Sequence, residues 1–141
     1  MAWFDTYGLE SLDLTFREIA EIPLDVQEKI LNAQADVVVE AQRESAKAYG
    51  VEDTGLMIDK IKKTGVKFRK DGSYVIHVYP QGKRKRGNLS TPNTEIGFEN
   101  EFGKKGQEAR PWMQTANERC AEETTAAGAA VLDEWYKSLD L

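Results

Sequence analysis

The sequence predicts an α+β fold, in which a small antiparallel β-sheet packs against two long helices, with a short N-terminal helix before them. Two segments, at about 24–49 and 112–138, carry apolar residues at steps of three and four, which is the spacing of a helix with one buried face. Between these segments the period changes to two, which is typical of strands. Because helices and strands occupy separate parts of the chain, the order favours α+β over alternating α/β.

Two helices are expected in the N-terminal third. A short amphipathic helix that ends before Pro23 is indicated by apolar residues at helical spacing, namely Leu9, Leu12, Phe16 and Ile19. The helix at 24–49 carries two adjacent apolar stripes, so we expect it to pack on more than one side. Gly50 suits a left-handed C-terminal cap, with Val51 packing back on the last turn.

The triplet Asp53, Thr54 and Gly55 follows this helix and precedes a short apolar segment at 56–61. Either Asp53 or Thr54 could cap a helical turn there. The same triplet occurs in the catalytic loop of aspartic proteases, where two carboxylates share a proton, and a homodimer could supply the second carboxylate. Such a protease needs an apolar strand before the triplet, whereas a helix and the charged Glu52 precede it here. We therefore interpret the triplet as a capping turn.

The middle of the chain predicts a hairpin with its turn at Asp71-Gly72. We prefer a three-residue turn, which pairs Arg69 with Ser73, because it places on one face the apolar residues Val66, Phe68, Tyr74, Ile76 and Val78. A third strand is predicted at about 95–102, where apolar residues alternate with glutamates. Residues 80–94 contain two prolines, two glycines and no apolar periodicity, which predicts a long mobile loop.

The last helix is expected to begin at Pro111 and to run to about Ser138, because proline is favoured at the first helical position. Its full-length buried stripe consists of Met113, Ala116, Cys120, Thr124, Ala127, Val131 and Trp135. Many of these residues are small, so the alanine-rich helix at 24–49 can approach closely. Trp112 lies beside the stripe, and we expect it to anchor the start of this helix against the sheet.

The net charge of −5 is unevenly distributed, with a basic segment between two acidic flanks. Residues 60–91 carry ten basic and one acidic side chain, residues 1–59 carry four and thirteen, and residues 92–141 carry five and ten. The strongest cluster lies in the predicted loop and consists of Lys83, Arg84, Lys85 and Arg86. It indicates either sequence-independent contact with phosphates or docking on an acidic surface of another subunit. The acidic flanks favour the subunit contact.

The residue types that build catalytic and metal sites are scarce. His77 is the only histidine and Cys120 the only cysteine, which excludes an internal disulfide, a multi-cysteine zinc site and a histidine cluster. Three glutamates are expected along one strand face, where a solvated edge explains them better than a cation site does, namely Glu95, Glu99 and Glu101. We therefore expect no enzymatic activity and no catalytic, cofactor or metal site.

The 141 residues, with 40% hydrophobic and 30% charged side chains, are typical of one globular domain spanning 1–141. No apolar run approaches the length of a membrane span, and no secretory signal is visible at the N-terminus. We therefore expect no membrane partner.

Two motifs in the C-terminal half resemble a known family. Glu101-Phe102-Gly103, a short polar turn and then Ala109-Arg110-Pro111-Trp112 before a long helix are similar to the tail-component family of long-tailed phages and prophages. Members of that family are called tail-completion, neck or head–tail joining proteins. Upstream, Asp53-Thr54-Gly55-Leu56 after a long helix matches the family's turn, and the order of elements agrees over roughly residues 9–138. Trp112 stands where phenylalanine is commoner, and the basic loop is not part of the pattern.

The resemblance implies a structural virion protein, not an enzyme, that completes the tail or joins the head connector to the tail as part of an oligomeric ring. Its partners would be copies of itself, the connector or adaptor, and the tail-tube or tail-terminator proteins, with no cofactor. It would lie in the neck or tail of the virion after assembly in the bacterial cytoplasm, where the basic loop could also contact packaged DNA. The alternative is a sequence-independent nucleic-acid-binding module that acts through residues 60–86.

Overall fold

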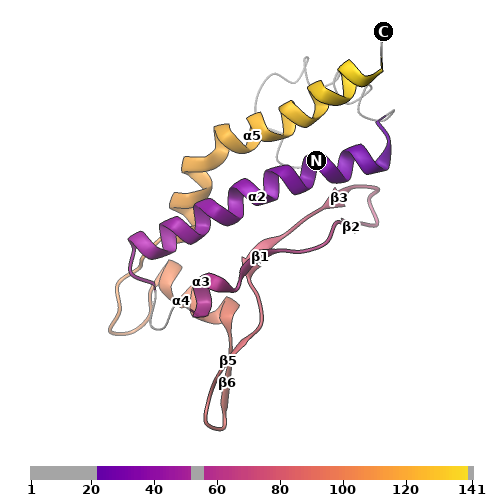
Figure 1. The fold of residues 1–141 in the computed structure, drawn as a ribbon. Coiled ribbons are helices and arrows are strands. Elements are labelled where there is room, and N and C mark those ends of the chain that lie inside the picture. Colours follow the sequence, from indigo (N-terminus) through magenta and orange to yellow (C-terminus); the bar gives the residue numbers. More distant parts are fainter. Residues whose placement is uncertain (1–21, 52–55, 140–141) are drawn as a thin grey trace.

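Two long helices lie side by side and run in opposite directions (Figure 1). The structure is a computed structural model that describes residues 22–51 and 56–139. Helix α2 spans Leu24–Ala48 and helix α5 spans Trp112–Ser138, as the sequence predicts within one to two residues. Short helices and small antiparallel sheets lie between them, so the fold is α+β. The predicted N-terminal helix and the triplet Asp53-Thr54-Gly55 lie outside the described residues.

The contact between α2 and α5 combines small residues with buried amides. On α5, the predicted stripe is buried or half-buried along its whole length, with Ala116 and Cys120 among its most buried members. The Gln34 side chain of α2 is also buried, and it lies against Gly128 of α5. A Cβ atom at Gly128 would lie 2.5 Å from Nε2 of Gln34, so the glycine provides the room for this amide. Glycine has a low helix propensity, and its presence at position 128 is explained by the space that the Gln34 side chain occupies.

Helix α2 ends in a Schellman motif at Gly50. Gly50 has a φ of +66°, which a residue without a Cβ adopts at no steric cost. The N–H of Val51 donates to the carbonyl of Ala46, and the N–H of Gly50 donates to that of Lys47, each at 3.0 Å. Val51 is buried, as the sequence predicts for the residue that packs back on the last turn.

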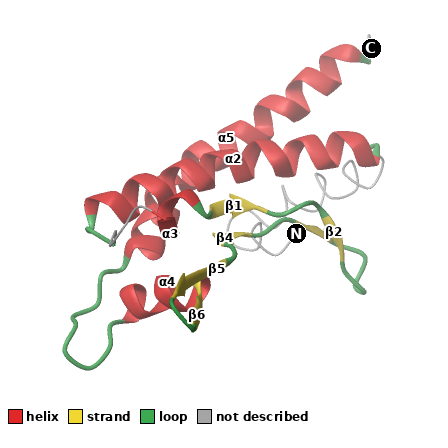
Figure 2. Cartoon of the chain, turned by 60° about the horizontal axis from the view of Figure 1, so that its bottom comes forward, coloured by secondary structure: helices red, strands yellow, loops and turns green. Residues whose placement is uncertain are grey.

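The strands form antiparallel pairs rather than one sheet. In the part of the chain that the structure describes, β1 (Ile61–Lys63) pairs with β4 (Val78–Pro80), β2 (Lys67–Phe68) with β3 (Tyr74–Val75), and β5 (Lys83–Arg86) with β6 (Leu89–Pro92). The first strand thus begins at Ile61, before the expected start near Val66, and Ile61 is fully buried. Figure 2 shows β1 and β4 beneath the helix pair.

The predicted turn of the β2–β3 hairpin is confirmed. Phe68 lies opposite Tyr74, and the N–H of Arg69 donates to the carbonyl of Ser73 at 2.8 Å. The carboxylate of Asp71 accepts hydrogen bonds from the hydroxyl and the N–H of Ser73, and the pKa of Asp71 lies below its usual value because of them. The apolar face is not covered, however, since Phe68 is 67% exposed.

The prediction of a long mobile loop at 80–94 is wrong. Residues 83–92 form the β5–β6 ribbon, whose strands are joined by a two-residue turn with Gly87 at a φ of +60°. The ribbon has exposed side chains along both strands, so it lacks the apolar alternation by which a strand is recognised. Its base is fixed to the next helix, because Asn93 donates to the carbonyl of Gly82 through its N–H at 2.9 Å and to that of Gln81 through Nδ2 at 2.7 Å.

The predicted strand at 95–102 is also wrong, because Asn93–Phe102 form helix α4. The buried residues of α4 are Asn93, Gly97 and Glu101, which recur at steps of four, as one face of a helix requires. Phe98 and Phe102 are 53% and 74% exposed and stack on each other with ring centroids 6.0 Å apart. The aromatic residues that suggested a strand thus lie on the outer face, and small and polar residues lie inside.

The buried core sits where the C-terminal end of α2, the start of α5 and helix α3 (Leu56–Asp59) meet β1. It consists of Ala46, Val51, Met57, Ile58, Ile61 and Trp112. Helix α4 adds Ile96 at the edge of this cluster. This cluster therefore lies at one end of the helix pair, while Val26, Leu31 and Cys120 are buried farther along it.

We expect Gly50→Ala to lower the free energy of unfolding by about 1–2 kcal/mol, because a Cβ at positive φ crowds the following backbone. Urea unfolding followed by circular dichroism measures this loss. Gly65→Ala is the matched control, since its φ is not in the left-handed region and a Cβ there meets nothing within 4 Å. Equal stability of the two variants would contradict the assignment of Gly50 as a cap.

Candidate functional site

A buried carboxylate from α4 holds the start of α5. The N–H groups of Met113 and Gln114 donate to the two oxygens of Glu101, at 2.7 and 3.0 Å. Glu101 is only 6% exposed, so both hydrogen bonds are partly shielded from water. Pro111, in the N-cap position, has no side-chain hydrogen bond to the helix. Glu101 therefore supplies the cap from another element, with its negative charge at the positive end of the helix dipole.

Trp112 joins three helices at the same point. Its side chain is fully buried, and its Nε1 donates to the carbonyl of Gly97 in α4 at 3.0 Å. Its own carbonyl accepts from the hydroxyl of Ser45 in α2 at 2.7 Å. A Cβ at Gly97 would lie 3.1 Å from Cζ2 of Trp112, so the glycine permits this close contact. The prediction that Trp112 anchors the start of α5 is confirmed, but it packs against helix α4 where a strand was expected.

Arg110 links this junction to the end of α2. Its Nη1 donates to the carbonyl of Gly50 at 3.0 Å, and its N–H donates to the carbonyl of Asn100 at 2.6 Å. Gly103, which ends α4 with a φ of +80°, would place a Cβ 2.9 Å from the backbone nitrogen of Ala109. A side chain at 103 would therefore prevent the chain from returning toward α4.

The structure thus brings together five of the residues that carry the family resemblance, namely Glu101, Gly103, Arg110, Pro111 and Trp112. Phe102 does not join them, because it is exposed on the other face of α4. Asp53, Thr54 and Gly55 lie outside the described residues. Three of them, Glu101, Arg110 and Trp112, contact backbone groups around the junction through their side chains, so they hold the junction together.

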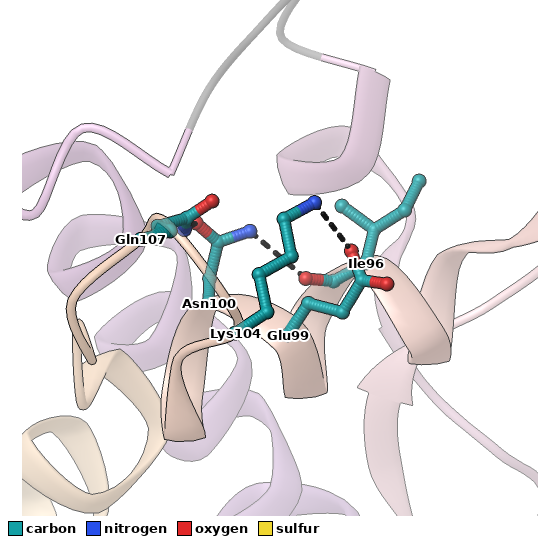
Figure 3. Close-up of polar contacts among 5 residues, drawn as sticks. All are labelled: Ile96, Glu99, Asn100, Lys104 and Gln107. Atoms are coloured by element: carbon teal, nitrogen blue, oxygen red, sulfur yellow. Dashed lines mark hydrogen bonds and ion pairs between the residues drawn. The ribbon is translucent and has the colours of Figure 1, made fainter.

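A cleft of about 520 Å³ lies between the β5–β6 ribbon, α4 and the turn after α4. Figure 3 shows the polar contacts among five of the residues that line it, all from α4 and the turn that follows. Lys104 binds Glu99 at 3.1 Å, Gln107 Nε2 donates to Oδ1 of Asn100 at 2.9 Å, and Asn100 Nδ2 donates to the carbonyl of Ile96 at 2.9 Å. These contacts hold the turn against the helix. They do not bring a nucleophile and a base together.

The single histidine and the single cysteine lie apart from this cleft in the fold. His77 is exposed beside β4, and Cys120 is buried between α2 and α5. The three glutamates expected along one strand face are separated, because Glu101 caps α5, Glu99 pairs with Lys104 and Glu95 is exposed. Among the described residues, no three metal-ligating side chains gather at one point, and no helix has the length and apolarity needed to cross a membrane.

The predicted basic cluster lies on β5, and three of its side chains are divided between the two faces of the ribbon. Lys83 and Lys85 are exposed on the outward face, whereas Arg84 is half-buried and lines the cleft together with Thr91 of β6. Arg86 ends the strand, at the turn. Lys83 and Lys85 are therefore presented to solvent on one face of the ribbon.

A second basic surface lies on the β2–β3 hairpin, within the basic segment 60–86, although the sequence did not indicate that aromatic rings are exposed beside its charges. Phe68 and Tyr74 contact each other across the hairpin with ring centroids 5.3 Å apart. Lys67, Arg69 and Lys70 of the same hairpin are exposed. The signal was present as alternation of aromatic and basic residues, but that pattern also indicates a half-buried strand.

Comparison with known proteins found no match to this chain among family models, curated proteins or solved structures. Its function is therefore inferred from its own residues and their contacts.

We expect Glu101→Ala to lower the free energy of unfolding by about 1–3 kcal/mol, because it leaves two N–H groups at the start of α5 without their partner. Thermal or urea unfolding measures the loss. Glu95→Ala is the control, since it removes an exposed glutamate from the same helix and should change stability by less than about 0.5 kcal/mol. If both variants unfold alike, Glu101 does not stabilise the junction.

Proposed function

We propose that this protein is a structural virion component of a phage or prophage, which completes the tail or joins the head connector to the tail as a subunit of an oligomeric ring. One observation carries the proposal. The residues that resemble the tail-component family are separated in the sequence by a polar turn. In the fold, Glu101, Arg110 and Trp112 come together around the start of α5. The two C-terminal motifs therefore form one structural unit, which supports treating them as a single pattern.

The way these residues are used supports a structural role. Glu101 is engaged with two N–H groups, and Trp112 and Arg110 donate to carbonyls. Each contact is with the backbone of this chain, so these groups hold helices in place rather than recognise a substrate. Arg110 contacts Gly50, the cap of the helix that precedes the family's other motif in the sequence.

The exposed features suit a protein that contacts several neighbours. The β5–β6 ribbon projects from the body, and the stacked pair Phe98 and Phe102 is exposed on α4. Exposed aromatic side chains and unpaired strand edges are typical of surfaces that become buried on association. The partners we propose are copies of this chain, the connector or adaptor, and the tail-tube or tail-terminator proteins, in the neck or tail of a virion assembled in the bacterial cytoplasm.

We expect that interrupting the gene in its phage or prophage yields filled heads and separate or incomplete tails in negative-stain images, with infectious titre reduced by orders of magnitude. The reason is that a missing ring leaves the connector and the tail without their joint. Complementation with the wild-type gene should restore joined particles, and the protein should be detected in them. Complete, infectious particles that lack the protein would refute the proposal.

A second candidate function is binding of single-stranded nucleic acid through residues 60–86, and the β2–β3 hairpin favours it. The exposed ring of Phe68, flanked by Lys67 and Arg69, provides the stacking surface and the charge that such proteins combine. The −5 net charge and the acidic flanks weigh against it, which is why we rank it second.

For this candidate we expect binding of an oligonucleotide in fluorescence anisotropy to fall steeply as salt rises, and Phe68→Ala to weaken it by about 1–3 kcal/mol. Phe98→Ala is the control, because it removes an exposed ring from α4 instead. Absence of binding at low salt, or equal effects of the two variants, would exclude the candidate.

A further inference from the structure

We propose that the outward face of the β5–β6 ribbon of one copy docks into an acidic groove between α2 and α5 of a second copy. This inference rests on the proposed function, since a ring places copies beside one another, and it names the two surfaces that meet. The charges of the two surfaces, their spacing and the direction in which the ribbon projects all support this contact.

The ribbon presents two exposed lysines side by side. Lys83 and Lys85 lie on its outward face, and in the part of the chain that the structure describes neither forms an ion pair. The paired residues on the same face, Pro92 and Ser90, are exposed as well. A two-stranded ribbon on its own is marginally stable in water, so it gains from packing against another surface.

The groove presents three carboxylates over an apolar floor. Its volume is about 190 Å³, with Glu40 and Glu44 on α2 and Glu123 on α5 at its walls. The floor is made of Val37, Ala41 and Cys120. Within residues 22–51 and 56–139, none of the three glutamates forms an ion pair. Arg119 also lines the groove, so its lining carries three negative charges and one positive charge.

The spacings of the two sets of charges match. Lys83 and Lys85 are two residues apart on one strand face, which separates them by about 6.5–7 Å. Glu40 and Glu44 are one helical turn apart, which separates them by about 6 Å along α2. A ribbon laid along α2 can therefore place each lysine opposite a carboxylate, with Glu123 on the other wall. Such pairing of unlike patches determines register and orientation.

The two surfaces of one copy do not face each other. Among the described elements, β6 contacts α4, and Figures 1 and 2 show the ribbon on the α4 side, away from the helix pair. The partner is therefore a second copy, whose own ribbon remains available for a third. Such a head-to-tail contact between unlike patches forms a closed ring when the rotation between copies permits it.

A charge-swap experiment tests the contact. One variant carries Lys83→Glu and Lys85→Glu, and the other carries Glu40→Lys and Glu44→Lys. Sedimentation equilibrium at low salt should show concentration-dependent association of the wild-type protein and at least about 10-fold weaker self-association of each variant, because like charges then face each other. An equimolar mixture of the two variants should associate again, since the reversed ribbon of one variant then finds the reversed groove of the other. Lys67→Glu with Lys70→Glu is the control, as it makes the same charge change on the other hairpin.

The proposal is overturned if the wild-type protein stays monomeric, if the mixture associates no better than its components, or if the control variant is weakened as much. It is also overturned if loss of Lys83 and Lys85 abolishes DNA binding and leaves self-association unchanged. Circular dichroism of each variant verifies that it folds. If the mixed variants do not associate but the protein is found in virus particles, only this contact is refuted. If the mixed variants associate but the protein is absent from particles, only the proposed function is refuted.

Discussion

Every helix begins with backbone N–H groups that lack partners, and the way this chain satisfies them at α5 determines the position of three helices. The carboxylate that accepts two of these hydrogen bonds belongs to Glu101 of α4, so the start of α5 is stabilised by the docked α4. Burial of this charge is costly by itself, but two N–H donors and the helix dipole offset the cost. Trp112, which follows at once, then contacts Gly97 of α4 and Ser45 of α2. The cap of α5 and the packing of Trp112 therefore depend on the same position of α4, and loss of either contact weakens the other.

The sequence predicts the elements whose determinants are local. The stripes of α2 and α5, the Schellman motif at Gly50 and the Arg69–Ser73 register of the β2–β3 hairpin depend on spacing and turn residues within a few positions. Helix α4 and the β5–β6 ribbon depend on distant contacts instead. Gly97 is buried because Trp112, fifteen residues later, fills the space beside it, and the ribbon carries too few apolar residues to signal a strand. The spacing of apolar residues cannot reveal a contact with a distant residue, and it cannot reveal a strand that lacks apolar residues.

The candidate site likewise combines residues that the sequence identifies with contacts that only the fold reveals. The resemblance identifies Glu101, Arg110 and Trp112, but their roles require the fold, because the partners of Glu101 lie twelve and thirteen residues away on another helix. The charge pattern identifies the basic run at 83–86, whereas only the strand register shows that Lys83 and Lys85 share the outward face. The acidic groove is still harder to predict from the sequence, because Glu40 and Glu123 line one groove only through the packing of α2 on α5.

The attachment of the ribbon to α4 through Asn93 has a mechanical consequence. Two short hydrogen bonds from Asn93 fix the base of the ribbon, and Asn93 is itself the first residue of α4. A pull on the ribbon therefore acts along α4, whose far end holds α5 through Glu101. Tension at the tip is thus transmitted to the longest helix through a short series of hydrogen bonds to the backbone. A force applied to the ribbon would therefore reach the start of α5 and the buried Trp112 beside it.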